Sequence, residues 1–143
     1  MNQYKFIIIP FLGIIFSQII KFILESIKYK KICIDRLFNG SGGMPSTHSS
    51  FVSSLTTLVY LELGLTSIYF AICLVFSLII IYDSMGVRYE AGKQAEVLND
   101  IVEKIKINNK IKELKEKVGH KPIEVLCGVL LGISISLIFN ELI

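Results

Sequence analysis

Long apolar segments constrain the fold of this 143-residue chain more than any other feature. Four of them stand out, at residues 6–24, 49–65, 67–82 and 123–139. A helix needs about 20 residues to cross a hydrocarbon core about 30 Å thick, so the last three segments need flanking residues or some tilt. Because a backbone in lipid must satisfy its own hydrogen bonds, the segments are predicted to be helices. We expect an all-α integral membrane helical bundle of about four transmembrane helices, in a single domain over residues 1–143.

The composition excludes an ordinary soluble domain, since 52% of the residues are hydrophobic and only 19% are charged. The first apolar segment is too long for a signal peptide, it contains Lys21, and no small-residue cleavage site follows it. We therefore expect this segment to be retained as a membrane helix.

The distribution of basic residues predicts how the bundle lies in the membrane. Apart from Lys5 and Lys21, every lysine and arginine falls within residues 25–47 or 83–121. Four crossings put these two connections on one face, which the positive-inside rule makes cytoplasmic. We therefore expect a multi-pass protein of the cell (plasma) membrane with both termini outside, and with Glu62 solvated and idle in the opposite loop.

The second basic connection contains an insert, at about residues 89–118, in which apolar residues recur at helical spacing between acids and lysines. Two amphipathic helices that lie on the membrane or cap the bundle would produce this pattern, and so would a solvated charged hairpin. Either arrangement suits anionic lipid headgroups, so we expect the membrane bilayer as a partner and no nucleic acid.

The last apolar segment contains Gly128 and Gly132, a small-xxx-small spacing that lets another helix approach closely. Such spacings also arise by chance. We favour packing of these glycines within the bundle and leave a homodimer open.

The two histidines of the chain each stand at the start of an apolar segment, behind residues rich in glycine and small polar side chains. His48 ends the run at residues 40–48, His120 precedes the last segment, and a third polar run contains Arg88. The predicted topology puts all three runs on the cytoplasmic face. A histidine at the edge of an apolar helix is unusual unless its proton chemistry is used, so the three runs predict one reaction centre.

His120 has the features of an oriented nucleophile. Pro122 suits the first turn of a helix, and Glu124, four residues after His120, lies on the same helical face. A carboxylate bonded to one imidazole nitrogen fixes the tautomer, which leaves the lone pair of the other nitrogen to attack. The alternatives are a structural interfacial histidine and a glutamate that merely suits the helix N-terminus.

His48 has surroundings that suit a general acid beside a phosphate. Gly43 permits a backbone turn that other residues resist. Helix-initial N–H groups, together with the hydroxyls of Ser46 and Thr47, would form an oxyanion pocket. His48 would protonate a leaving alkoxide there.

Two cations are available to bind a phosphoryl group. Arg88 supplies a planar fork of donors, and Lys21 supplies a point charge unless it snorkels to the headgroups instead. With the two histidines, these groups suit phosphate ester cleavage without a metal or a cofactor.

Three motifs occur in order along the chain. They are Gly42-Gly43-Met44-Pro45-Ser46-Thr47-His48-Ser49, the run from Asp83 to Asn99 around Gly86-Val87-Arg88, and Gly119-His120-x-Pro122-x-Glu124. Together they resemble the divergent branch of the type 2 phosphatidic acid phosphatase superfamily, which is related to the vanadium haloperoxidases, from about residue 17 to the C-terminus. The resemblance implies that His120 becomes a phosphohistidine and that His48 is the general acid. It further implies that Glu124 orients His120 and that phosphate is bound by Ser46 and Arg88.

The chain departs from the superfamily pattern at three points. Thr47 replaces the usual glycine, and Glu124 replaces the usual aspartate at the same spacing. Arg88 and His120 are far apart, whereas the superfamily normally keeps them within one short motif. The insert would therefore have to fold away and return the chain to the site.

Several positions have no assigned role from the resemblance. The superfamily's first motif has no clean match, so Lys21 is our candidate for its lysine and Arg36 a weaker second cation. Asp83, Gln94 and Asn99 belong to the branch's own pattern, and we expect them to support the site. Asp83 would hold the neighbouring guanidinium, cap a backbone turn or ligate a metal.

The sequence thus predicts an integral membrane phosphatase, independent of metal, that hydrolyses a lipid phosphate through a phosphohistidine. The candidate substrates are phosphatidylglycerol phosphate, phosphatidic acid and polyprenyl pyrophosphate. One alternative is a non-catalytic lipid-binding or scaffold relative. Another is a metal-dependent phosphotransferase, because residues 83–92 are faintly similar to the CDP-alcohol phosphotransferases, although the spacing of their carboxylates is not reproduced.

Overall fold

The fold consists of helices throughout the part of the chain that the structure, a computed structural model, describes: residues 3–32, 42–105, 114, 116 and 118–143. The helices are α1 (Lys5–Tyr29), α3 (Thr47–Leu63), α4 (Ile68–Met85), α5 (Val87–Ile105) and α6 (Pro122–Asn140). The predicted all-α class is confirmed.

Three stretches of helix are long and apolar enough to cross a membrane, which confirms the predicted membrane class. They are α1, α6 and the continuous 38-residue stretch Ile68–Ile105, which joins α4 and α5. The predicted count of four crossings is not established, because α3 has only 17 residues and much of its buried face is serine.

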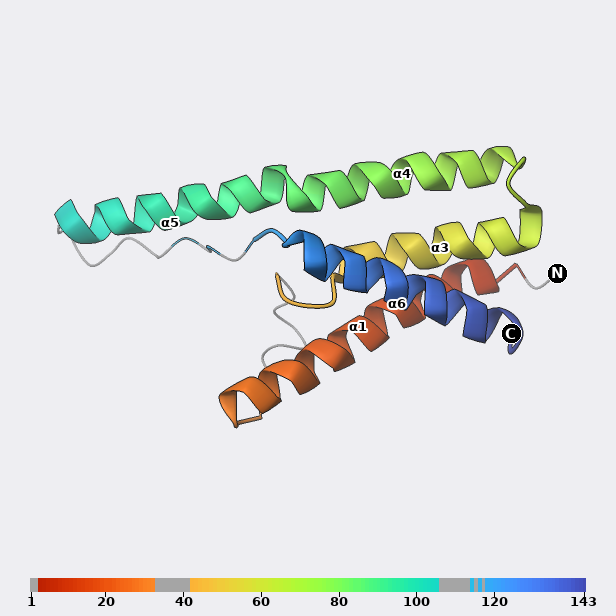
Figure 1. Cartoon of the computed structure of the whole chain (residues 1–143), viewed down its shortest axis with the longest axis horizontal. Helices are drawn as coiled ribbons and strands as arrows, with labels where there is room; N and C mark the ends of the chain where they lie inside the picture. The colour runs from red at the N-terminus through yellow and green to blue at the C-terminus, as the bar shows by residue number, and fades with distance from the viewer. Residues whose placement is uncertain (1–2, 33–41, 106–113, 115, 117) are drawn as a thin grey trace.

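Helix α3 packs between α1 and α6, and small residues line both contacts (Figure 1). A Cβ added at Gly128 would collide with the carbonyl oxygen of Ser46, and one added at Gly132 would collide with the hydroxyl of Ser53. The two glycines therefore face α3, as predicted for packing within the bundle. Ile9, Leu58 and Ile135 form the apolar cluster in which α1, α3 and α6 meet.

The buried serines of α3 make hydrogen bonds that connect the three helices. The hydroxyl of Ser50 donates to the carbonyl of Gly13 in α1 at 3.2 Å, and Ser136 in α6 donates to the carbonyl of Ser54 at 2.6 Å. Each bond satisfies a hydroxyl that burial removes from water. Helix α3 is thus polar on the face that the bundle covers.

The end of the bundle near the two termini is closed by an ion pair. The ammonium group of Lys5 lies 2.5 Å from Oε1 of Glu62 and 3.1 Å from Oδ1 of Asn140, so α1, α3 and α6 are joined there. The side chain of Glu62 is only 17% exposed. The expectation that Glu62 is solvated and idle is wrong, because a buried ammonium group on α1 needs a carboxylate beside it.

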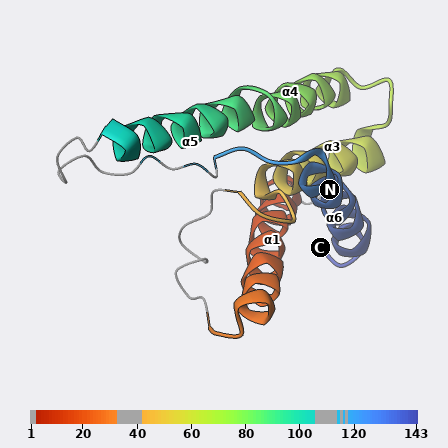
Figure 2. The ribbon, with the colours of Figure 1, turned by 60° about the vertical axis from the view of Figure 1, so that its left-hand side comes forward.

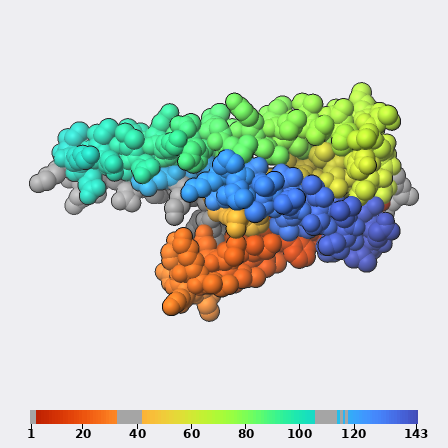
Figure 3. Space-filling view, in the orientation of Figure 1, coloured from red at the N-terminus to blue at the C-terminus, as the bar shows by residue number. Residues whose placement is uncertain are grey.

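Helices α4 and α5 form one long rod beside this bundle (Figures 1 and 2). The space-filling view shows them as a continuous ridge above α6 (Figure 3). Most large side chains of α4 are exposed, including Ile79 at 61% and Tyr82 at 76%, which suits contact with lipid tails.

The insert leaves the bundle along α5 and returns beside it (Figure 1). Because α5 continues the direction of α4 in both ribbon views, α5 does not lie flat across the end of the bundle. The first of the two predicted helices is α5. The second falls on residues 106–113, 115 and 117, outside the described residues.

Candidate functional site

The loop before α3 is held against the start of α6. Gly42 and Gly43 have φ values of 74° and 84°, a region that favours glycine. The backbone N–H of Ser46 donates to the carbonyl of Glu124 at 2.9 Å. This bond joins the first predicted motif to the third, although about 75 residues separate them in the sequence.

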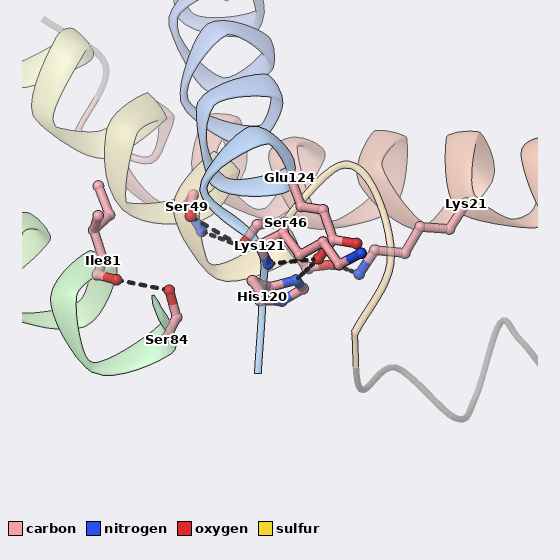
Figure 4. A network of polar contacts seen from close by, with 9 residues as sticks. Lys21, Ser46, Ser49, Ile81, Ser84, His120, Lys121 and Glu124 are labelled. Atoms are coloured by element: carbon pink, nitrogen blue, oxygen red, sulfur yellow. Dashed lines mark hydrogen bonds and ion pairs between the residues drawn. The ribbon is translucent and has the colours of Figure 1, made fainter. Parts of the chain in front are cut away.

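Ser46 is the N-cap of α3 and is fully buried. Its hydroxyl oxygen accepts hydrogen bonds from the backbone N–H of Ser49 at 3.3 Å and from the hydroxyl of Ser49 at 2.9 Å (Figure 4). Capping uses the lone pairs of this oxygen, whereas binding a phosphate would use its O–H as a donor. The backbone N–H groups of Thr47 and His48 lie in the first turn of α3. The N–H groups of a first turn have no acceptor within their own helix.

His120 is placed by its backbone as well as by its ring. Its N–H donates to the carbonyl of Ser84 at the end of α4, at 3.0 Å. The imidazole is buried, and Nδ1 lies 3.0 Å from Oε2 of Glu124 (Figure 4). If Nδ1 carries the proton, Nε2 carries the lone pair. The side-chain contact is the one that the sequence predicted for an oriented nucleophile.

The carboxylate of Glu124 also caps its own helix. Its Oε2 accepts from the backbone N–H of Lys121 at 3.1 Å, in the first turn of α6. Orientation of the imidazole and capping of the helix were considered as alternatives, but one carboxylate does both. A glutamate at this position can reach back to the turn and to His120 together.

Lys21 points into the bundle. Only 1% of this residue is exposed, and its ammonium group donates to Oγ1 of Thr47 at 2.7 Å. Figure 4 shows the side chain reaching from α1 toward the ends of α3 and α6, where His120 and Glu124 lie. The alternative in which Lys21 snorkels to the headgroups is wrong, because α3 covers its ammonium group.

Arg88 lies at the start of α5 and is paired with Asp83 at the end of α4. Its Nε lies 2.6 Å from Oδ2 of Asp83, and both side chains are partly exposed. Among the three roles considered for Asp83, the contact supports the one that holds the guanidinium. In the described part of the chain, no group of three or more His, Cys, Asp or Glu side chains is arranged to hold a metal ion.

His48 lies at the mouth of a cavity of about 210 Å³, outside the three helical stretches that can cross the membrane. The lining also includes Asp83, Ser84 and Arg88, and the apolar side chains Ile79 and Ile80. His48 is exposed on one side, so a ligand can reach it. The cavity therefore joins the first predicted motif to the second.

Neighbouring groups perturb the imidazole of His48. Desolvation lowers the pKa of His48 below its ordinary value, and electrostatic interactions with Arg88, His120 and Lys21 lower it further, whereas Asp83 raises it. These groups come from α1, α3, the α4–α5 junction and the start of α6. Arg88, His120 and Lys21 thus lie close enough to His48 to perturb it, at one end of the bundle.

A larger cavity of about 530 Å³ adjoins the same end. Its lining includes Gly43 and Glu124, together with Lys28 and Lys121, which the sequence analysis did not assign to the site. In the sequence, Lys121 is marked only by its place beside His120, and Lys28 only by its place in the first basic connection. Ser84 was missed as well, because it acts on His120 through its backbone carbonyl, which no sequence pattern reveals.

The remaining predicted positions lie away from the histidines. Gln94 is exposed on α5. Asn99, farther along α5, contacts Leu114 and Glu116 of the returning chain. Arg36 lies outside the described residues.

Comparisons with known proteins identify the family of this chain. The model of the Divergent PAP2 family matches residues 2–135. The chain is 41% identical over 139 residues to the uncharacterized membrane protein YuiD of Bacillus subtilis (strain 168), a match that covers 88% of this chain and 87% of that protein. No solved structure gives a significant match. The chain belongs to the Divergent PAP2 family of membrane proteins.

Proposed function

We propose that this protein is an integral membrane phosphatase that hydrolyses a lipid phosphomonoester or pyrophosphate through a phosphohistidine. The supporting observation is that His48 lies within electrostatic range of His120, Arg88 and Lys21. His48 and Arg88 line one small cavity, and His120 and Lys21 lie close enough to act on His48, so the group suits the binding and transfer of a phosphoryl group.

In the first step, Nε2 of His120 attacks phosphorus, and a P–N bond forms as the bond to the lipid oxygen breaks. Protonated His48 gives its proton to that oxygen, so the lipid leaves as a neutral alcohol or as the shorter phosphate. Arg88 and Lys21 balance the negative charge on the phosphoryl oxygens. Glu124 holds the proton on Nδ1 and stabilises the positive charge that develops on the ring.

In the second step, water attacks the phosphohistidine. His48, now neutral, takes a proton from the water, and the P–N bond breaks to release inorganic phosphate. His120 regains its lone pair and His48 regains its proton, so both histidines return to their starting states. Neither step requires a metal ion.

The lowered pKa of His48 agrees with this cycle. In the empty site, desolvation and the positive charges of Arg88 and Lys21 oppose protonation of the imidazole. A bound phosphate brings negative charge that offsets them, so the general acid is charged mainly when substrate is present.

A lipid substrate is favoured by the apolar side of the cavity. Ile79 and Ile80 of α4 line it together with His48 and Arg88, and Ile79 is 61% exposed on the outer face of the rod. The hydrocarbon of a lipid could therefore lie on α4 while its phosphate reaches the cations. The basic connections favour a cytoplasmic site in the cell membrane, and with it an intermediate of phospholipid synthesis such as phosphatidylglycerol phosphate or phosphatidic acid.

The proposal is tested by a phosphate-release screen in detergent with phosphatidylglycerol phosphate, phosphatidic acid and polyprenyl pyrophosphate. The wild-type protein is compared with His120→Ala, His48→Ala and a matched control, Ser134→Ala, an exposed position on α6. We expect His120→Ala to abolish phosphate release from every substrate and Ser134→Ala to leave it unchanged. Substantial turnover by His120→Ala would remove the phosphohistidine mechanism.

Two additions distinguish the alternative functions. Vanadate, which imitates the phosphoryl group, should bind and inhibit; binding without any hydrolysis of the screened lipids would indicate a non-catalytic relative. Activity should survive exhaustive chelation, and its loss would favour a metal-dependent phosphotransferase.

A further inference from the structure

The side chain of Asn99 holds the returning chain against α5. Its Oδ1 accepts from the backbone N–H of Leu114 at 3.0 Å, and its Nδ2 donates to the carbonyl of Leu114 at 2.9 Å. Nδ2 also donates to Oε1 of Glu116 at 2.9 Å. The carboxamide thus pairs with both backbone groups of one residue, as a neighbouring β-strand would.

Small residues let the returning chain lie directly on the helix. Gly92 is two turns before Asn99 on the same face of α5, and a Cβ there would collide with the carbonyl oxygen of Glu116. A Cβ at Gly119 would collide with the backbone of Tyr89. Ala95, between these contacts, is buried. The register of the returning chain along α5 is therefore set by backbone contact at both glycines and by the Asn99 carboxamide.

This register reaches the candidate site within a few residues. His120 directly follows Gly119, and its N–H is bonded to the carbonyl of Ser84. The chain from Leu114 to His120 is consequently pinned at one end by Asn99 and at the other by α4. A shift at Leu114 would move the imidazole relative to the cavity that Arg88 lines.

We propose that Asn99 is a positioning residue, which fixes the returning chain on α5 and so sets where the His120 ring stands. The catalytic part of this inference rests on the proposed phosphatase function. A misplacement of about 1 Å at a reacting group can lower a rate by about 10²-fold. Lys21 and Arg88 lie outside the returning chain, so substrate binding should depend on Asn99 much less than turnover does.

The test compares Asn99→Ala with Asp100→Ala, a matched change at the neighbouring exposed position of α5. Amide exchange of the peptide that contains Leu114 should be about tenfold faster in Asn99→Ala, because an N–H that loses its acceptor opens to solvent. In the same variant kcat should fall about tenfold while KM changes by less than about threefold. Asp100→Ala should match the wild type in both measurements.

A second variant pair separates positioning from general damage to the fold. Asn99→Asp keeps an acceptor for the Leu114 N–H, but it removes the donor and sets a carboxylate against Glu116. Adding Glu116→Gln supplies a donor from the other side of that contact. We expect the double variant to recover part of the exchange protection and part of kcat that Asn99→Asp loses.

Each result decides the inference. Unchanged exchange in Asn99→Ala would overturn the clamp, and faster exchange with unchanged kcat would overturn the positioning role. If the wild-type protein hydrolyses none of the lipids, the proposed function is wrong, but this result does not bear on the contacts of Asn99. Exchange then still decides the clamp, and the NMR resonances of the His120 ring, expected to shift in Asn99→Ala but not in Asp100→Ala, decide whether Asn99 positions His120.

Discussion

His48 and His120 carry the same side chain in opposite surroundings. The ring of His120 is buried beside the carboxylate of Glu124, whereas His48 is exposed at a cavity among positive charges. Environments that separate the protonation behaviour of two titratable groups allow one to act as nucleophile and the other as acid. The pH dependence of the proposed reaction therefore originates in the different surroundings of these two side chains.

The pH profile should show the lowered pKa of His48. The general acid must be protonated, so kcat/KM, which reports the free protein, should fall as pH rises through a value below 6.5, the ordinary value of histidine. The fall in kcat should come at higher pH, because bound phosphate raises the pKa of His48. Steady-state rates between about pH 5 and 8 check both limbs. Limbs that coincide, or a kcat/KM limb above 6.5, would contradict the assignment.

Charge changes beside the cavity should move that limb in opposite directions. Arg88→Gln removes a positive charge that lowers the pKa of His48, so the kcat/KM limb should move to higher pH. Asp83→Asn removes a negative charge that raises this pKa, so the limb should move to lower pH. Arg88→Gln should also raise KM by at least about tenfold, since a charged hydrogen bond to phosphate is lost. Shifts of the same sign in both variants would show that His48 does not control the limb.

At the scale of elements, the bundle depends on close approach between α3 and α6. Gly128 and Gly132 face the carbonyl of Ser46 and the hydroxyl of Ser53, so only small groups separate the two backbones. Close backbone approach gives apolar helices packing contacts that lipid tails cannot supply. The same contact holds the N-terminus of α3 beside the N-terminus of α6, where the two histidines lie.

Gly132→Ala should therefore destabilise the protein. The added methyl group must displace Ser53 or the backbone at Ser50, and overpacking of this kind costs about 1–3 kcal/mol of the free energy of unfolding. Ser134→Ala, on the exposed side of the same helix, should change it by less than about 0.5 kcal/mol. Unfolding in detergent followed by circular dichroism measures both. If the two variants are equally stable, Gly132 does not pack closely against α3.

Over the whole molecule, the two ends of the bundle have different tasks. One end gathers the histidines, Arg88 and Lys21, and the other joins α1, α3 and α6 through Lys5, Glu62 and Asn140. The ion pair at the second end is largely buried, so neither partner can be removed cheaply. Stability and proposed chemistry should therefore be separable by substitution.

Glu62→Gln tests this separation. It leaves the ammonium group of Lys5 without its carboxylate but with two neutral acceptors, the amide oxygens of the new glutamine and of Asn140, so the cost is about 1–3 kcal/mol. The midpoint of thermal unfolding should fall, while kcat/KM, measured well below that midpoint, should stay within about twofold of the wild type. Lys5→Met combined with Glu62→Met should recover much of the stability. A large fall in kcat/KM with the fold intact would show that the two ends are coupled.

The membrane class, the helical fold and the contact between His120 and Glu124 in the candidate site were predictable, because they depend on local patterns. Apolar run length specifies a helix in lipid, and the spacing of His120 and Glu124 places both on one helical face. The contacts of Glu62 and Ser84 were not predictable. Glu62 meets an ammonium group from the far end of the sequence, and Ser84 acts through its carbonyl.

Hydrophobicity and helical periodicity alone thus indicate a helical membrane protein and roughly where its helices lie, since these properties are summed over neighbours in sequence. Whether Arg88 and His120 meet is a different matter, because about 30 residues of insert lie between them. Their relative positions depend on contacts between residues that are distant in the sequence. The returning chain lies against Gly92, is hydrogen-bonded to Asn99, and reaches the carbonyl of Ser84. Such contacts depend on three-dimensional register, which the order of residues along one helix does not contain.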